Sequence, residues 1–455
     1  MPSFRLRTLA VVTAAGLIGF ANTAGAQDSN YWTLQYGTRG ELLGGVVVGS
    51  AVDLSATYYN PGSLSLVEDP SVILTATVIG VQTIRLRGED SGQDVVSSQT
   101  IGPQPSMLAG LLPMEWFGGR VAYSFLTRQK LDFRLQEREG AIIGYDVPGD
   151  TLSLGGEIYL DQDVSEQWGG LTWSKRAGER LGVGATLYGV YRSQTTSIRQ
   201  TVDAIGGAGF GASLRDWYDI NYYSADLLVK IGVEAELAGG SWGLSITTPN
   251  LNVFGSGDIL INRTVIGDPN FDGTDDSASD VSYGKDVDVE YRSPFSIAIG
   301  GSYDWETTTM HATAEFFTSV DEYTVMEAAP PPGGPGVTAY PSEVNHALND
   351  VLNFGVGIER RFSEDTTAYV SFITDRSAFR VTENRNISVS TWDIYHLNGG
   401  VVFAIGGTDL TVGGGYAWGS NPIRVTPDSE GQLPPTIVPT EVTYSRLKFI
   451  LGFAL

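Results

Sequence analysis

The sequence beyond residue 70 is dominated by long runs in which apolar and polar residues alternate. Between 287 and 303, the odd positions are mostly apolar, as in Val289, Phe295 and Ile299, whereas the even positions are polar or small. A period of two places successive side chains on opposite faces of a β-strand. The same alternation recurs over residues 119–125, 181–191, 351–362, 368–372 and 401–416. The pattern predicts an all-β protein whose extended strands each carry one apolar face.

Three features favour lipid over a protein core as the environment of that apolar face. The runs are longer than ordinary globular strands of roughly 5–6 residues and suit tilted membrane strands. Short turns at 363–365 and 406–409 alternate with long segments at 263–285, 325–349 and 419–440, as periplasmic turns alternate with outer loops. Tryptophans recur near the ends of the runs, as interfacial girdles require: Trp168, Trp173, Trp242, Trp305, Trp392 and Trp418. We therefore predict a transmembrane antiparallel β-barrel; the alternative is a secreted array of β-sandwiches.

The C-terminal segment has the pattern of a closing strand. Apolar residues fall on one face, with Arg446 and Lys448 on the other: Leu447, Phe449, Leu451, Phe453 and Leu455. Outer-membrane barrels most often end on an aromatic residue, and this chain ends on Leu455 with Phe453 two residues earlier. Closure is a physical requirement, because an open sheet edge in hydrocarbon leaves backbone N–H and C=O groups unpaired. The pattern indicates that this strand completes the barrel.

Composition excludes several other classes. The chain of 455 residues carries 28 Lys and Arg against 52 Asp and Glu, a net charge of -24. Nucleic-acid binding needs clustered basic residues and is therefore excluded. The absence of cysteine excludes disulfide scaffolds, thiolate metal sites and cysteine nucleophiles. After the N-terminus, no stretch has the roughly 18 or more uncharged apolar residues of a membrane helix.

The first 26 residues have the order of a secretory signal peptide. Arg5 and Arg7 form a basic region, residues 9–21 are apolar, and Ala24-Gly25-Ala26 is a small-residue cleavage site. We expect export through the Sec pathway and a mature chain that starts at Gln27.

Residues 27–69, which we call the hatch segment, do not alternate. They are rich in glycine up to Gly49 and continue with Asp53 and the turn Asn60-Pro61-Gly62-Ser63-Leu64. Pro61 fixes its own φ and keeps Asn60 out of a helical conformation, while the Asn60 side chain is suited to bond nearby backbone groups. Small residues let the backbone of such a segment approach a barrel wall closely. We predict that it fills the lumen of a barrel formed by residues 70–455.

The hatch segment resembles the N-terminal hatch of the FadL/TodX family of outer-membrane transporters for long-chain fatty acids and hydrocarbons. That hatch contains a Gly- and Ala-rich run, an Asp and an Asn-Pro-Ala turn, and here residues 44–53 and Asn60-Pro61-Gly62 follow in the same order, with Gly62 in place of Ala. The run 244–262 is similar to an outer strand of the family but lacks its Tyr-Arg pair. The Pro294-containing strand 286–304 and the two final hairpins follow in the family's order. The resemblance implies about 14 strands, whereas chain length alone also accommodates about 12 or about 16.

The resemblance implies a function as an outer-membrane channel that takes up long-chain fatty acids or other hydrophobic compounds in a Gram-negative bacterium. In that interpretation the hatch segment gates the lumen and substrate leaves laterally through the wall. Asn60, Pro61, Gly62 and Leu64 shape the gating turn, and Asp53 tethers it. Expected partners are the hydrophobic substrate, outer-membrane lipid and lipopolysaccharide, and the barrel-assembly machinery through the C-terminal strand. The alternative is a general solute porin or a structural barrel with a loose N-terminal tail.

Other motifs carry weaker interpretations. Asp268, Asn270, Asp272 and Asp276 have the spacing of a calcium loop with Gly273 at the sixth position, but Ser279 replaces the bidentate acid at the twelfth. Calcium is thus a weak candidate beside a solvated acidic loop, and no other cofactor is expected.

Candidate groups for a substrate carboxylate or for catalysis are few. Arg376, Arg380 and Arg385 are candidate partners for a fatty carboxylate, although balancing an acidic surface is the simpler interpretation. His311, His346 and His396 are the three histidines, and none stands in a lipase-like motif. We expect no enzymatic activity, and the sequence singles out no ligand-binding residues.

Overall fold

The computed structural model describes residues 29–51, 53–67, 72–88, 94–144, 151–206, 211–237, 239–267, 275, 277–329, 342–380, 382, 385–386, 392–406, 408–422 and 439–454. The predicted signal peptide, the calcium candidates Asp268, Asn270, Asp272 and Asp276, and Leu455 lie outside these residues. The described part of the hatch segment contains the short helices α2 (Thr38–Leu42) and α3 (Ala56–Tyr59) and the 3-10 helix η2 (Ser63–Ser65). The strands are β1 (Val72–Gly88), β2 (Asp94–Trp116), β3 (Gly119–Gly144), β4 (Thr151–Arg176), β5 (Leu181–Gly206), β6 (Gly211–Leu237), β7 (Gly240–Thr247), β8 (Leu251–Gly267), β9 (Ala278–Asp288), β10 (Ser296–Trp305), β11 (Thr308–Phe317), β12 (Val320–Glu327), β13 (Glu343–Leu348), β14 (Val351–Ser363), β15 (Thr366–Asp375), β16 (Arg385–Asn386), β17 (Asp393–Ile405), β18 (Thr408–Pro422) and β19 (Pro439–Ala454).

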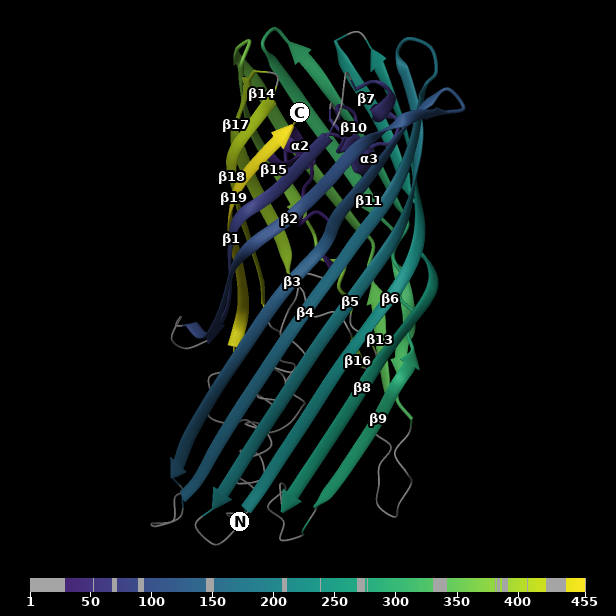
Figure 1. Cartoon of the computed structure of the whole chain (residues 1–455). Helices are drawn as coiled ribbons and strands as arrows, with labels where there is room; N and C mark the ends of the chain where they lie inside the picture. The colour runs from purple at the N-terminus through teal and green to yellow at the C-terminus, as the bar shows by residue number, and fades with distance from the viewer. Residues whose placement is uncertain are drawn as a thin grey trace.

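The sheet closes into a 14-strand antiparallel barrel (Figure 1). Around the ring the order is β1–β2–β3–β4–β5–β6–β7–β10–β11–β14–β15–β17–β18–β19, and β19 pairs back to β1. Pairing of Leu74 with Phe453 joins the first strand to the last. The predicted barrel is confirmed, and its strand number is the one implied by the resemblance.

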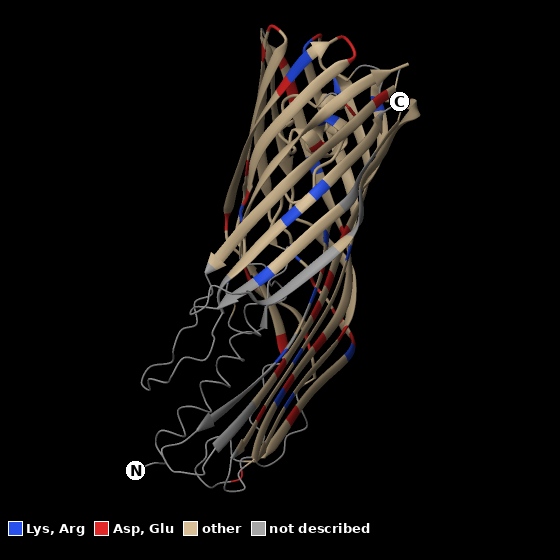
Figure 2. Ribbon diagram, turned by 90° about the vertical axis from the view of Figure 1, so that its left-hand side faces the viewer, with Lys and Arg blue, Asp and Glu red and all other residues tan. Residues whose placement is uncertain are grey.

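Several strands extend well beyond the rest of the barrel (Figure 1). β6 pairs with β7 over Lys230–Leu237 and then with β8 over Ala212–Leu227, so the hairpin β8–β9 continues the wall beyond β7 and β10. Acidic and basic residues are interspersed along these extended strands (Figure 2). Strands β12, β13 and β16 form a separate three-stranded sheet.

The outer face of the barrel is apolar. Large apolar side chains that point outward include Ile299 at 56% exposure, Val356 at 53% and Phe449 at 51%. Their strand neighbours Ala298, Gly355 and Ile450 point inward and are buried. An apolar belt of this extent is unfavourable in water and is suited to hydrocarbon. The structure thus confirms the orientation that the alternation predicts.

Two predicted strands are interrupted. The run 287–303 does not form one strand, because β9 ends at Asp288 and β10 begins at Ser296. Pro294 has no N–H to donate to a ladder, and the Asn250 side chain bonds Tyr291 O at 2.8 Å and Ser293 N at 2.6 Å instead. The run 244–262 is likewise divided, at 248–250. The predicted loops at 263–285, 325–349 and 419–440 are also shorter than expected, because strands enter each of them.

The tryptophan prediction holds for part of the set. Trp242, Trp305 and Trp418 point outward, at 57%, 60% and 37% exposure. The prediction is wrong for Trp168 and Trp392, which are buried inside the barrel at 7% and 0% exposure. Trp168 donates its indole N–H to the Glu166 carboxylate at 2.7 Å, a bond that stabilises an inward indole.

The two ends of the barrel differ. We call the end that carries the tight turns at 117–118, 306–307 and 364–365 the short-turn end, and the opposite end the long-loop end. At 117–118 both residues have positive φ, 50° for Phe117 and 67° for Gly118, as tight hairpins require. Helices α2 and α3 lie inside the barrel toward the short-turn end (Figure 1). In the described part of the chain, no helix has the length and apolar character needed to cross a membrane.

Candidate functional site

The hatch segment turns at Asn60, whose side chain joins it to the barrel wall. The Asn60 Nδ2 atom donates to the Val48 carbonyl at 2.7 Å and to the Val233 carbonyl of β6 at 3.0 Å. The Asn60 Oδ1 atom accepts from the Gly62 N–H at 3.1 Å. This is the local side-chain bonding that Asn-Pro favours in a turn. Asn60 is fully buried, so each of these bonds lies away from water.

The other predicted residues of the turn are placed around Asn60. Gly62 lies against the backbone of the wall, where an added Cβ would come within 2.7 Å of the Gly232 carbonyl and 2.8 Å of the Gly182 carbonyl. Leu64 is fully buried among apolar side chains of the hatch segment and wall. Asp53 accepts from the Ser55 N–H at 2.8 Å and from the Thr38 hydroxyl at 3.4 Å. Both of these bonds lie within the hatch segment.

A buried polar link joins α2 to β11 and β14. Arg39 pairs with Glu359 and also donates to the Ser50 carbonyl at 2.9 Å. The Ser50 hydroxyl bonds His311 Nδ1 at 2.9 Å, and His311 Nε2 lies 3.5 Å from Glu359. Because Arg39 neutralises Glu359 and the group lies at a contact between hatch segment and wall, the arrangement is a tether.

The N-terminal end of the hatch segment is held by Asp375 of β15. Its carboxylate accepts from the Trp32 N–H at 2.8 Å and from the Thr33 hydroxyl at 2.7 Å. Asn30 donates to the Asp375 carbonyl at 2.8 Å, and the Ser29 and Ser377 hydroxyls lie 2.9 Å apart. This end therefore lies on β15 and on the segment that follows it.

Strand β3 has a β-bulge beside the hatch segment. Its pairing with β4 shifts register between Thr127 and Gln129, so Arg128 is the extra residue. The Tyr36 hydroxyl donates to the Thr127 carbonyl at 2.9 Å. The described ladder between β2 and β3 runs from Trp116–Gly119 to Met107–Leu126 and stops there, whereas both strands continue. The bulge thus marks a seam in the wall at the level of the hatch segment.

Two buried cations of the wall lie against aromatic rings of the hatch segment and of β4. The Arg128 guanidinium lies 5.8 Å from the Trp168 ring and 5.9 Å from the Tyr31 ring. The Lys230 ammonium lies 4.6 Å from the Tyr58 ring, and Tyr58 contacts Trp168 with ring centroids 6.0 Å apart. We call these five residues the cation chamber. Within the described residues neither cation pairs with a carboxylate, and Arg128 Nη1 is buried with no hydrogen-bond partner. The arrangement is suited to an anionic or polar head group.

Beyond the cation chamber, toward the long-loop end, the lumen is lined by apolar and aromatic side chains. A buried cluster there includes Leu131, Phe133, Leu160, Ile220, Ile261, Val325 and Trp392. Arg192, a fully buried arginine near this cluster, pairs with Glu166 at 3.0 Å and lies 4.3 Å from the centroid of the Tyr291 ring. Such a lining lowers the free energy of an apolar molecule by excluding water from it.

The other residues singled out by sequence do not form a site. Arg376 and Arg380 are exposed, and Arg380 lies 3.8 Å from Asp321; the Arg385 side chain is not among those described. His346 bonds the Tyr323 hydroxyl at 3.1 Å and His396 lies 3.7 Å from Asp375. No group of three or more metal-ligating side chains occurs among the residues the structure describes.

The cation chamber was missed by sequence reasoning, although a signal was present. Arg128 is in phase with Ala122, Ser124 and Leu126, which point inward, and Lys230 is in phase with Leu228. A basic residue on the inward phase of a barrel strand is such a signal, since the lumen is the only place where its charge is solvated or paired.

The same fold is found in transporters of known structure. The Pseudomonas putida toluene transporter TodX matches with a TM-score of 0.52, covering 93% of this chain and 99% of TodX at 12% sequence identity. A Pseudomonas aeruginosa FadL homologue matches with a TM-score of 0.54 over 93% and 99% at 10% identity. The Ralstonia pickettii toluene transporter TbuX matches with a TM-score of 0.50 over 92% and 98% at 13% identity. No protein-family model matches the sequence, and no curated protein does. The predicted resemblance to the FadL/TodX family is confirmed for the fold.

Proposed function

We propose that this protein is an outer-membrane channel for the uptake of hydrophobic compounds in a Gram-negative bacterium. The observation that carries the proposal is the arrangement of the barrel interior: an apolar buried cluster lies next to the cation chamber, and two rings of that chamber, Tyr31 and Tyr58, belong to the hatch segment. A solute porin needs a continuous aqueous path, which this arrangement does not favour. TodX and TbuX, two of the proteins of known structure with this fold, are toluene transporters.

The cation chamber favours a substrate that combines an apolar body with a negative head group. Arg128 and Lys230 supply charge for a carboxylate, and the rings of Tyr31, Tyr58 and Trp168 supply apolar contact. A long-chain fatty acid has both parts. A neutral aromatic hydrocarbon uses the rings alone, so the two substrate classes differ in their dependence on the cations.

Gating would require the hatch segment to move relative to the wall. Its side-chain bond to the wall at Asn60 is to one carbonyl, that of Val233 in β6. The seam between β2 and β3 begins at the bulge that Tyr36 contacts. Displacement of the hatch segment would uncover this seam, where no ladder beyond Met107–Leu126 is described. Lateral release of an apolar molecule into the membrane follows, because the outer face there is apolar.

A disulfide staple tests the movement directly, because the chain has no cysteine of its own. Ser29 and Ser377 have hydroxyls 2.9 Å apart, a separation compatible with a disulfide after substitution of both by cysteine. We expect vesicles or cells with oxidised S29C/S377C to lose uptake of a labelled fatty acid and to regain it after reduction. Each single-cysteine variant is the control. Equal uptake by the oxidised and reduced protein would contradict a moving N-terminal end.

Planar-bilayer conductance separates the transporter from the alternative of a general porin or structural barrel. A sealed bilayer, with the hatch segment (residues 27–69) protected from protease, supports the transporter. Large stable ohmic currents support the porin. Substituting Asn60-Pro61-Gly62 and finding both uptake and small-solute leakage unchanged would remove the gating role of the turn.

The outer-membrane assignment brings further expected partners. Outer-membrane lipid and lipopolysaccharide would surround the apolar belt, and the barrel-assembly machinery would engage β19. Cell fractionation and site-specific crosslinking from β19 test these expectations.

A further inference from the structure

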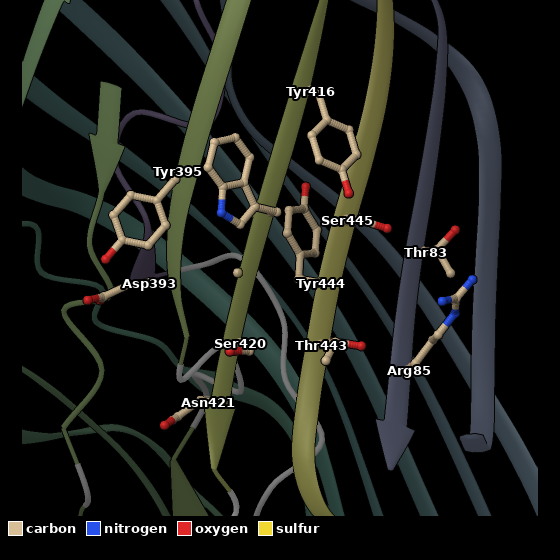
Figure 3. A pocket seen from close by; sticks show the side chains of 12 residues that line it. Thr83, Arg85, Asp393, Tyr395, Tyr416, Ser420, Asn421, Thr443, Tyr444 and Ser445 are labelled. Atoms are coloured by element: carbon tan, nitrogen blue, oxygen red, sulfur yellow. The ribbon is translucent and has the colours of Figure 1, made fainter. Parts of the chain in front are cut away.

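The outer wall has a groove at the level where its apolar belt ends. It has a volume of about 660 Å³ and lies across β17, β18, β19 and β1 (Figure 3). Its polar lining includes Arg85, Asp393, Asn421 and four short hydroxyl side chains: Thr83, Ser420, Thr443 and Ser445. Tyr416 and Trp418 line the groove from β18 and Arg85 lines it from β1, with Thr443 and Ser445 of β19 between these two strands.

Strand register arranges the lining in rows across the four strands. In the row nearest the apolar belt, Val81 pairs with Leu447, and Leu447 with Tyr416. The next row joins Thr83, Ser445, Trp418 and Tyr395, and the row beyond it joins Arg85, Thr443, Ser420 and Asp393. The wall therefore changes from apolar, to aromatic and hydroxyl, to charged over three successive rows.

The position of these rows fits the outer boundary of a membrane. Trp418 lies roughly one membrane-strand length, about 9–11 residues, from the start of β18 at Thr408 at the short-turn end. Phe372, Tyr395, Trp418 and Tyr416 form a continuous row of ring contacts, with centroids 6.2, 6.0 and 5.7 Å apart. Aromatic belts lie where lipid head groups meet acyl chains. The concave groove beside this row is therefore at head-group depth.

We propose that the groove binds the phosphorylated sugar head group of an outer-leaflet glycolipid, lipid A being the probe. The Trp418 ring face is suited to stack on a sugar ring, and the hydroxyls of Thr83, Ser445 and Thr443 are suited to bond its polar groups. Arg85 matches a phosphate, which accepts bidentate hydrogen bonds from guanidinium. Acyl chains of the same molecule would lie along Leu447 and the apolar belt. The proposal rests on the outer-membrane placement given above.

The test compares lipid adducts retained by the purified full-length protein in native mass spectrometry, with lipid A or phosphatidylglycerol added at equal concentration. We expect a lipid A adduct on the wild type that falls by roughly tenfold or more in Arg85→Gln and in Trp418→Leu, as loss of one charge-assisted contact implies. Ser445→Trp, which fills the floor of the groove, has the same expected effect. Trp305→Leu is the matched control, since Trp305 is an exposed tryptophan at the short-turn end.

Heat-modifiable gel mobility shows which variants remain folded barrels before binding is compared. Equal lipid A retention by the folded wild type, Arg85→Gln and Trp418→Leu would overturn the proposal. Equal retention of phosphatidylglycerol and lipid A by the wild type would also overturn it, because the groove would then recognise only a generic phosphate lipid. The adduct is measured on purified protein, so failure of uptake or of outer-membrane fractionation would refute the proposed function without changing this result.

Discussion

Gly62 in the hatch segment and Gly232 in β6 are packed backbone against backbone, and a Cβ on Gly62 would lie 2.7 Å from the Gly232 carbonyl oxygen. The same Cβ would lie 2.8 Å from the Gly182 carbonyl oxygen of β5. Both neighbours are main-chain atoms of the barrel wall, so neither side has a flexible side chain that would yield. The closeness of hatch segment and wall at this point depends on glycine.

Replacing Gly62 by alanine should therefore loosen the turn. Overpacking against backbone costs about 1–3 kcal/mol, and the hatch segment would shift to relieve it. We expect faster proteolysis within residues 29–67 and increased small-solute leakage through the barrel. Gly189→Ala is the matched control, because its added Cβ would meet nothing closer than 3.8 Å. Unchanged protection of the hatch segment in Gly62→Ala would show that the turn adapts freely.

Asn60→Ala should weaken the same turn for a different reason. The substitution removes the Asn60 donors to the Val48 and Val233 carbonyls, and the loss of each such hydrogen bond costs about 0.5–1.5 kcal/mol. We expect protease sensitivity and single-channel openings to rise together. Asn349→Ala provides the comparison, since the Asn349 amide bonds the Phe379 carbonyl at 2.8 Å in an exposed position. A silent bilayer with Asn60→Ala would contradict a gating role for Asn60.

The alternating pattern of the sequence predicted most of the barrel strands. It did not predict the bulge in β3 or the break between β9 and β10. Lipid imposes one apolar face on every strand, so alternation identifies the strands, as it does at Ile297 and Ile299. Alternation alone cannot show where a strand switches from even-numbered to odd-numbered residues pointing inward. The extra residue Arg128 shifts β3 so that Leu131 and Phe133 point inward, and the break before Ser296 leaves Val289 and Tyr291 buried. Both are set by pairing partners that are distant in the chain.

The hatch turn was predictable for a similar physical reason. Asn60 and Pro61 determine their conformation locally, and the structure has Asn60 bonded to Gly62 N–H as expected of such a turn. The contact of Gly62 with Gly232 depends on the register of β6 and is not visible in either local sequence. The cation chamber likewise depends on where β3 and β6 meet the hatch segment.

Substitutions in the cation chamber should distinguish between substrate classes. With Arg128→Met or Lys230→Met, we expect binding of a long-chain fatty acid to weaken about tenfold or more, as loss of a charge-assisted contact implies. A neutral aromatic hydrocarbon should bind within about threefold of wild type, because Tyr31, Tyr58 and Trp168 remain. Lys130→Met is the control, since Lys130 already pairs with Asp163 at 2.6 Å and is partly exposed. Equal losses for both ligands would indicate a packing effect and contradict head-group recognition.

Stability of the hatch segment should depend on pH through Glu41 of α2. Burial raises the pKa of the Glu41 carboxyl, an effect larger than the opposing attraction of Lys448. One carboxylate oxygen accepts from Ser106 at 2.6 Å, and the other is buried without a partner. The protonated form is therefore the one that the docked hatch segment favours. Glu41 therefore stabilises the docked state fully at a pH below the ordinary pKa of a glutamate, near 4.3. This stabilisation is lost as the pH rises from that value through the raised pKa of the docked state. Above that value the loss is complete and stability no longer changes with Glu41.

Thermal unfolding between about pH 4 and about pH 8 checks this expectation, because both limits bracket the titration of a carboxyl with a raised pKa. The midpoint of the wild type should fall with increasing pH more steeply than that of Glu41→Gln, in which the amide cannot ionise. Glu364→Gln, in the exposed turn before β15, should follow the wild-type curve. Parallel curves for wild type and Glu41→Gln would show that Glu41 titrates alike in the docked and released states. A steeper curve for Glu41→Gln would reverse the sign, and would mean that the Lys448 ammonium stabilises ionised Glu41 by more than burial penalises it.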